Sequence, residues 1–103
     1  MIAVKVSYTV DPTFVEQNKR NVNAFLQDFK KLNQLSFLYN VYVQSDGLTF
    51  LHISMYEDDT VQQRVLETPS FLSFQKERDE NGSHGFQIEN LEFIGSSLGT
   101  LTS

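Results

Sequence analysis

The first ten residues constrain the fold most, because apolar and polar side chains alternate there without a break. Ile2, Val4, Val6, Tyr8 and Val10 fall on one side of an extended chain. A period of two is typical of a β-strand with one buried face. We therefore expect residues 2–10 to form a strand that packs against another layer.

A helix is expected directly after this strand. Asp11 is a good N-cap, and Pro12 suits the first helical position because proline has no amide hydrogen to leave unpaired. Apolar residues then recur at spacings of three and four, interrupted by Asn18. This stripe predicts a helix over about residues 12–32 with one face in the core.

Two strands joined by a hairpin are predicted next. Residues 35–44 are rich in aromatic and β-branched side chains, and residues 48–56 alternate again. Between them lies Ser45-Asp46-Gly47, and an Asp-Gly pair between two apolar runs is a strong hairpin signal.

The second half of the chain predicts an interrupted helix and a last strand. Acidic residues 57–59 suit the start of a helix, and Thr68-Pro69 interrupts it and starts it again. The polar run 76–85 is interpreted as a loop and residues 86–94 as the last strand. A bulge near Asn90 is expected to reconcile the two apolar faces of that strand.

The element order is therefore β-α-β-β-α-β, which predicts an α+β fold of the ferredoxin-like type. In it a four-stranded antiparallel sheet carries helices on one face. Residues 1–95 are expected to form the single domain and residues 96–103 a C-terminal tail. The chain has 103 residues, which is enough for one core.

Composition excludes several classes of function. The chain has no cysteine, so it has no disulfide and no thiol nucleophile, and its net charge of −5 argues against binding nucleic acid. No apolar run is long enough to cross a membrane, and the start lacks the features of a signal peptide. We expect a cytoplasmic protein that binds neither membranes nor nucleic acid.

The face of the sheet without helices is where the sequence predicts a site. If the most apolar face of each strand packs against the helices, the other face combines aromatic rings with polar groups, as ligand pockets do. Such a face would be an exposed patch in a monomer, so we expect a homodimer. The candidate catalytic residues on it are His52, Asn40 and Tyr42, and the candidate substrate-binding residues are Tyr56, Phe50, Ser54, Ser7 and Lys5.

The stretch 37–77 resembles the antibiotic-biosynthesis monooxygenase type of dimeric α/β barrel. The resemblance is carried by the strand end Tyr56-Glu57-Asp58 and by the broken helix with Thr68-Pro69-Ser70-Phe71-Leu72-Ser73-Phe74. It implies that two sheets close face to face into a barrel across a dimer, with the open face lining a pocket.

The same resemblance guides the expected chemistry. Haem-degrading relatives carry a Trp and a His where this chain has Val65 and Gln75, so no haem is expected, nor any metal or flavin. Relatives that oxygenate polyketide anthrones need no cofactor. The resemblance thus implies a cofactor-independent monooxygenase acting on a small aromatic or polyketide-like molecule. If the protein is such an enzyme, the residues predicted on the open face suggest His52 as general base, with Asn40 and a tyrosine stabilising an oxyanion.

Other interpretations stay open. A non-enzymatic barrel that binds a small molecule, or a purely structural dimer, fits the same features. His52 then is a hydrogen-bonded interior histidine, Tyr42 and Tyr56 are packing residues, and Lys5 pairs with a carboxylate such as Glu89. An RNA-recognition module shares the element order, but the acidic charge and missing basic positions disfavour it.

Overall fold

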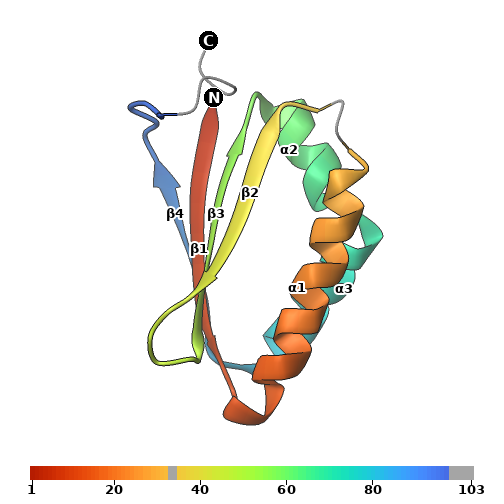
Figure 1. Cartoon of the computed structure of the whole chain (residues 1–103), viewed down its shortest axis with the longest axis vertical. Coiled ribbons are helices and arrows are strands. Elements are labelled where there is room, and N and C mark those ends of the chain that lie inside the picture. The colour runs from red at the N-terminus through yellow and green to blue at the C-terminus, as the bar shows by residue number, and fades with distance from the viewer. Residues whose placement is uncertain (33–34, 98–103) are drawn as a thin grey trace.

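The computed structural model describes residues 1–32 and 35–97, and in these residues one antiparallel sheet packs against one layer of helices (Figure 1). The strand order is β2-β3-β1-β4, which confirms the predicted α+β ferredoxin-like arrangement. Of the tail expected over 96–103, residues 98–103 lie outside the described part. The elements are β1 (Ile2–Val10), η1 (Pro12–Phe14), α1 (Val15–Lys30), β2 (Phe37–Val43), β3 (Thr49–Tyr56), α2 (Asp59–Leu66), α3 (Pro69–Asn81) and β4 (Gly82–Leu91).

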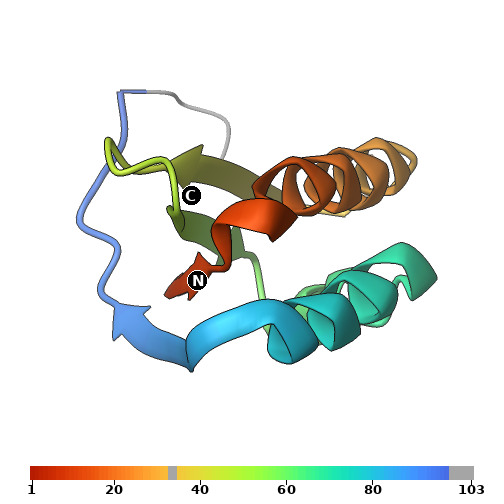
Figure 2. The same ribbon diagram turned by 90° about the horizontal axis from the view of Figure 1, so that it is seen from below.

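The helices all lie on one side of the sheet. Seen from below, α1 and α3 lie next to each other over one face, and the described chain places no helix on the other face (Figure 2). A hydrogen bond from Ser70 Oγ to Asp28 Oδ2, 2.6 Å long, joins the two helices. We call the two sides the helix face and the open face of the sheet.

The predicted helix starts are confirmed. The Asp11 carboxylate accepts a hydrogen bond from the amide of Thr13, and the Asp58 carboxylate accepts one from Val61, as N-caps do. Pro69 occupies the first turn of α3. The first helix differs from the prediction only in its ends, because it opens with the short 3-10 turn η1 and α1 ends at Lys30.

The loop predicted over residues 76–85 is wrong, because α3 continues to Asn81 and β4 begins at Gly82. Several polar side chains of this run have partners within the fold. Glu77 accepts a hydrogen bond from Asn21 of α1, and Asn81 donates one to the Glu77 carbonyl. Arg78 is buried. A helix with one buried polar side chain was therefore mistaken for a loop.

The predicted faces of β3 are also wrong. Val43 pairs with Phe50 and Val41 with His52 across the hairpin, and directly paired residues share a face. Because Val41 packs against the core, His52 lies on the helix face. The residues reassigned to that face are Phe50, His52, Ser54 and Tyr56, all buried, while Leu51, Ile53 and Met55 lie on the open face, partly exposed.

The irregularity in β4 lies near its start and not near Asn90. Between the pairs Tyr8–Phe86 and Val10–Gly82 the register shifts, and Gly85 has a φ of 73° that few residues other than glycine adopt. Beyond this point the register with β1 is regular. Phe86, Ile88 and Asn90 thus share the helix face with Tyr8, Val6 and Val4, while Gln87, Glu89 and Leu91 share the open face.

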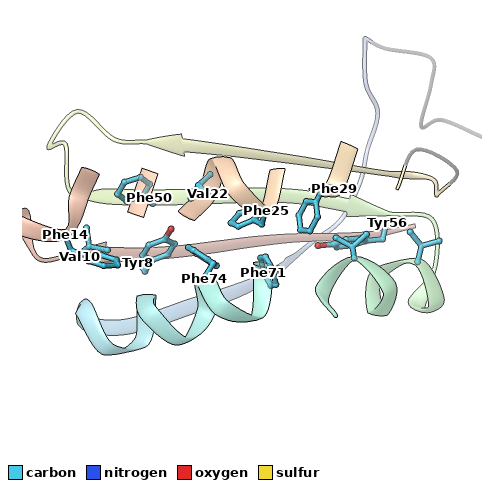
Figure 3. Close-up of a cluster of buried hydrophobic side chains, with 12 residues drawn as sticks. Tyr8, Val10, Phe14, Val22, Phe25, Phe29, Phe50, Tyr56, Phe71 and Phe74 are labelled. Carbon is cyan, nitrogen blue, oxygen red and sulfur yellow. The ribbon is translucent and has the colours of Figure 1, made fainter. Parts of the chain in front are cut away.

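The core between sheet and helices is mainly aromatic. Rings from β1, β3, α1 and α3 lie in one row in Figure 3. Phe25 of α1 is fully buried, with its ring centroid 5.0 Å from that of Phe74 and 5.1 Å from that of Phe71. Edge-to-face contacts of this kind favour one defined packing of the core.

Replacing Phe74 by Ala should destabilise the protein by about 3–5 kcal/mol, because it removes a buried ring from this row. The control is Leu72→Ala in the same helix, where the side chain is half exposed and the expected loss is below about 1 kcal/mol. Urea unfolding followed by circular dichroism measures both. Equal losses would contradict the assignment of the core.

Candidate functional site

The eight predicted site residues do not lie together. His52, Ser54, Tyr56 and Phe50 are on the helix face, whereas Asn40, Tyr42, Ser7 and Lys5 are on the open face by their pairing with β3 and β4. The expectation that one cavity is lined by Asn40, Tyr42, His52 and Tyr56 is therefore wrong, because a sheet separates the two pairs.

Three of the eight line a partly enclosed cavity between the sheet and α2 and α3. Its volume is about 200 Å³, and its mouth lies at the edge strand β4, where Phe86, Ile88 and Asn90 are exposed. The predicted residues among its lining are His52, Ser54 and Tyr56. The rest of the lining is Val4, Val6, Tyr39, Gln62, Leu66, Phe71, Gln75, Arg78, Phe86, Ile88 and Asn90.

Four of the other five predicted residues line separate hollows, and Asn40 lines none of those described. Phe50 and Tyr42 lie by a hollow of about 260 Å³ beside α1, and Lys5 and Ser7 line one of about 240 Å³ on the open face. A larger hollow of about 450 Å³ runs between α1 and β2, but it is more open and Lys30 is its one charged side chain. Of these four hollows among the described residues, the cavity under β4 is the most enclosed, and it is lined by an imidazole and a guanidinium.

A row of hydrogen bonds runs from this cavity into the core. Tyr39 Oη lies 2.8 Å from His52 Nδ1, and Tyr8 Oη lies 2.8 Å from His52 Nε2. Asn18 of α1 donates to Tyr8 Oη at 2.9 Å. We call Asn18, Tyr8, His52 and Tyr39 the buried polar row. Both ring nitrogens of His52 have a tyrosine as partner.

His52 is uncharged at neutral pH. Burial, and to a smaller extent the positive charge of Arg78, lowers the pKa of His52 to about 3. A group with such a pKa is a weak base, and both of its nitrogens are occupied. The expected role of His52 as a general base that contacts substrate directly therefore has no support in this geometry.

The tyrosines keep their protons. Burial raises the pKa of Tyr39 well above its usual value, and burial also raises the pKa of Tyr56, against a hydrogen bond with Ser54 that lowers it. These hydroxyl groups are therefore hydrogen-bond donors at any physiological pH. A ligand oxygen in the cavity would meet donors there and no negative charge from the tyrosines.

Arg78 supplies the positive charge of the cavity. Its side chain is only 6% exposed, and it contacts the Asp79 carboxylate at 3.0 Å. The guanidinium carbon lies 4.0 Å from the centroid of the Phe86 ring at the cavity mouth, a cation–π arrangement. A buried guanidinium beside aromatic rings suits an anionic planar ligand.

Sequence reasoning missed several residues of this site. Tyr8 lies on the predicted buried face of the first strand but was given no functional role, Tyr39 was given none either, and Asn18 was noted only as an interruption of an apolar stripe. That interruption was a usable signal, since an amide in the middle of a buried helix face needs a polar partner. Arg78 lies in the polar run that was interpreted as a loop and carried no local signal.

Two further properties concern the described residues alone. Within residues 1–32 and 35–97, no three histidine, cysteine, aspartate or glutamate side chains come together as a metal site would need. Nor does any helix in this part of the chain have the length and apolarity to span a membrane.

Comparison with solved structures identifies the fold. An antibiotic biosynthesis monooxygenase superposes with a TM-score of 0.80 at 11% identity, over 92% of this chain and 100% of that one. The chain has the fold of these proteins. A protein from Mycobacterium tuberculosis gives 0.79 at 13% identity over 94% and 98% of the chains, and one from Pseudomonas aeruginosa gives 0.74 at 19% over 91% and 94%. No protein-family model and no curated protein matches the sequence.

The lowered pKa of His52 predicts how stability depends on pH. Below about pH 6.5 the unfolded chain binds a proton on His52, while the folded chain does not until about pH 3. Stability should therefore fall as the pH is lowered through this window, by at most about 1.4 kcal/mol per pH unit. Above about pH 6.5 this contribution is complete and constant.

Urea unfolding between about pH 5 and 6.5, above the range where most carboxylates titrate, measures this slope. A His84→Gln background leaves His52 as the one histidine of the chain. Adding His52→Gln should abolish the slope. A flat profile in the His84→Gln protein would contradict the burial of a neutral His52.

Proposed function

We propose that the chain is a cofactor-independent monooxygenase-like protein that binds a small aromatic, polyketide-like molecule in the cavity between the sheet and helices α2 and α3. The observation that carries this proposal is the lining of the cavity. Aromatic rings, the protonated hydroxyl of Tyr39 and the buried guanidinium of Arg78 line one partly enclosed space. The similarity of the fold to an antibiotic biosynthesis monooxygenase supports the reaction class.

The proposed chemistry needs only substrate and dissolved oxygen. A phenol or enol bound beside Arg78 and Tyr39 would lose its proton to water more readily, because both groups stabilise the resulting anion. The electron-rich carbon of this anion then gives electrons to O₂ and forms a carbon–oxygen bond with it. For an anthrone, the CH₂ group becomes a carbonyl with one oxygen atom, and the second leaves as water with the two hydrogens.

A second candidate function is ligand binding without turnover. It is favoured by one observation, that both nitrogens of His52 are occupied by tyrosine hydroxyls, which leaves the cavity without a free strong base. The same rings and charges would then hold an aromatic anion unchanged. Oxygen uptake distinguishes the two functions.

Oxygen consumption with 1,8-dihydroxyanthrone tests the first candidate. The purified protein should accelerate uptake of one O₂ per anthrone, and Tyr39→Phe should lower kcat by about 10²-fold, as loss of an oxyanion donor does. Arg78→Gln should reduce the rate at least as much. Tyr42→Phe is the control, because Tyr42 lies on the open face, and its kcat should stay close to that of the native protein.

A loss of rate in Tyr42→Phe and none in Tyr39→Phe would contradict the placement of the site. Binding of 1-hydroxy-2-naphthoate, followed by its fluorescence, with no oxygen uptake from any substrate would support the second candidate. Neither binding nor uptake would overturn both candidates.

We further propose that the open face pairs with the open face of a second copy. Leu51, Ile53 and Met55 of β3 are partly exposed there, and Met55 pairs with the more exposed Leu38 of β2. On the other side of Met55, Ala3 of β1 separates it from the exposed Leu91 of β4. These side chains form an aliphatic strip across the sheet. A strip of this kind favours a buried interface between copies.

Light scattering after gel filtration should give a dimer mass at micromolar concentration. Ile53→Lys should shift the protein toward a monomer, because it places a charge in the middle of the aliphatic strip. Leu72→Lys, a matched change on the exposed side of α3, should leave the mass unchanged. A monomeric native protein would contradict the pairing.

A further inference from the structure

The buried polar row connects four elements through an otherwise apolar core. Asn18 comes from α1, Tyr8 from β1, His52 from β3 and Tyr39 from β2, and the first three are at most 3% exposed. Tyr39 and His52 line the cavity, whereas Tyr8 and Asn18 do not. The row therefore has one end at the proposed ligand and the other end deep under α1.

Hydrogen-bond directions in the row follow from its far end. The Asn18 amide nitrogen can only donate, so Tyr8 Oη accepts from it. The single proton of Tyr8 then has one acceptor among the described residues, His52 Nε2. His52 Nε2 must carry a lone pair, and in neutral histidine the proton is therefore on Nδ1. Nδ1–H donates to Tyr39 Oη.

The opposite orientation of the Asn18 amide would reverse the row. With the amide oxygen facing Tyr8, Tyr8 would donate to it, His52 would carry its proton on Nε2, and Tyr39 would donate to Nδ1. Both N–H groups of Asn18 would then point to where its oxygen, which has no partner, now lies. Buried N–H groups without partners are rarer than oxygens without partners, so the first orientation is favoured.

The orientation decides what the cavity offers to a ligand. Since Tyr39 Oη accepts from His52, its own proton has no acceptor among the described residues and is available beside the cavity. In the reversed row the Tyr39 hydroxyl would donate its proton in the hydrogen bond to His52 Nδ1. The ligand would then meet only a lone pair of Tyr39 Oη. The favoured orientation of the Asn18 amide therefore selects ligands with an acceptor oxygen, and the reversed orientation selects ligands that donate a hydrogen bond.

We propose that Tyr8, held by Asn18, is a positioning residue that fixes His52 as the Nδ1–H tautomer and thereby makes Tyr39 the hydrogen-bond donor to a ligand oxygen in the cavity. The proposal rests on the proposed function only for the identity of the ligand. The charged and titratable groups around His52 are Tyr8 from β1, Tyr39 from β2 and Arg78 from α3. The preferred ligands are enolates, phenolates and carboxylates, with Arg78 supplying the opposite charge.

Nitrogen-15 NMR of the ligand-free protein tests the tautomer. In protein labelled at histidine and carrying His84→Gln, long-range ¹H–¹⁵N spectra should show a protonated Nδ1 and an unprotonated Nε2 for His52. Free neutral histidine prefers the other tautomer, so the expected result differs from the default. An Nε2–H tautomer in this protein would overturn the proposal.

Tyr8→Phe tests whether Tyr8 sets the tautomer. Without its hydroxyl the ratio of Nδ1–H to Nε2–H should fall by about tenfold, which corresponds to the loss of about one hydrogen bond. Tyr56→Phe is the matched control, because Tyr56 is an equally buried tyrosine on the same sheet face and outside the row. An unchanged ratio in Tyr8→Phe, or an equal fall in Tyr56→Phe, would overturn the role of Tyr8.

A double-mutant cycle tests the effect on the ligand, with 1-hydroxy-2-naphthoate as the probe. Tyr8→Phe and Tyr39→Phe should each weaken binding several-fold, and the double variant should bind about as well as Tyr39→Phe alone, because Tyr8 acts through Tyr39. Additive losses would overturn the link between the two residues. If the probe does not bind the native protein and the anthrone gives no oxygen uptake, the proposed function fails, while the NMR result still decides the tautomer.

Discussion

The turn at Asp46-Gly47 sets the register on which the site depends. The Asp46 carboxylate accepts hydrogen bonds from the amides of Leu48 and Thr49 and from the Thr49 hydroxyl. Gly47 has a φ of 73°, which glycine adopts without strain. This turn places Val43 opposite Phe50. A slip of one residue would turn every side chain of β3 to the other face of the sheet.

Placing His52 in the core creates a need for hydrogen-bond partners, since a buried imidazole without them costs free energy. The strands on both sides of β3 meet this need. Tyr8 lies two residues beyond Val6, the direct partner of His52 in β1, and Tyr39 lies two residues from Val41, its direct partner in β2. The two tyrosines are therefore diagonal neighbours, within reach of opposite sides of the ring.

Element order and most element ends could be predicted from the sequence, because alternation, caps and prolines are local signals. The face of β3 could also have been predicted. If Asp46 and Gly47 are the two central residues of the hairpin turn, Val43 must face Phe50, as it does. The prediction went wrong by ranking the faces on hydrophobicity, since Leu51, Ile53 and Met55 form a more apolar set than one containing His52 and Ser54.

Arg78 shows what the local sequence cannot provide. It lies in a run of charged residues, and its burial depends on Phe86 of β4 and on the cavity that α3 and the sheet enclose. Those neighbours are set by the packing of β4 beside β1. Tyr39 is a similar case, because its role as a donor follows only once His52 is known to face the helices.

The two faces of β3 thus differ in chemistry for a physical reason. The helix face joins rings to hydroxyl, imidazole and guanidinium groups, and each polar group there needs a partner, which a packed core or a bound ligand provides. The aliphatic side chains of β3 on the open face need only to be removed from water, which a flat surface of a second copy can do. The proposed ligand site and the proposed dimer interface therefore lie on opposite sides of one sheet. Substitutions such as Ile53→Lys can change assembly without touching the cavity lining, so the two functions are separable by experiment.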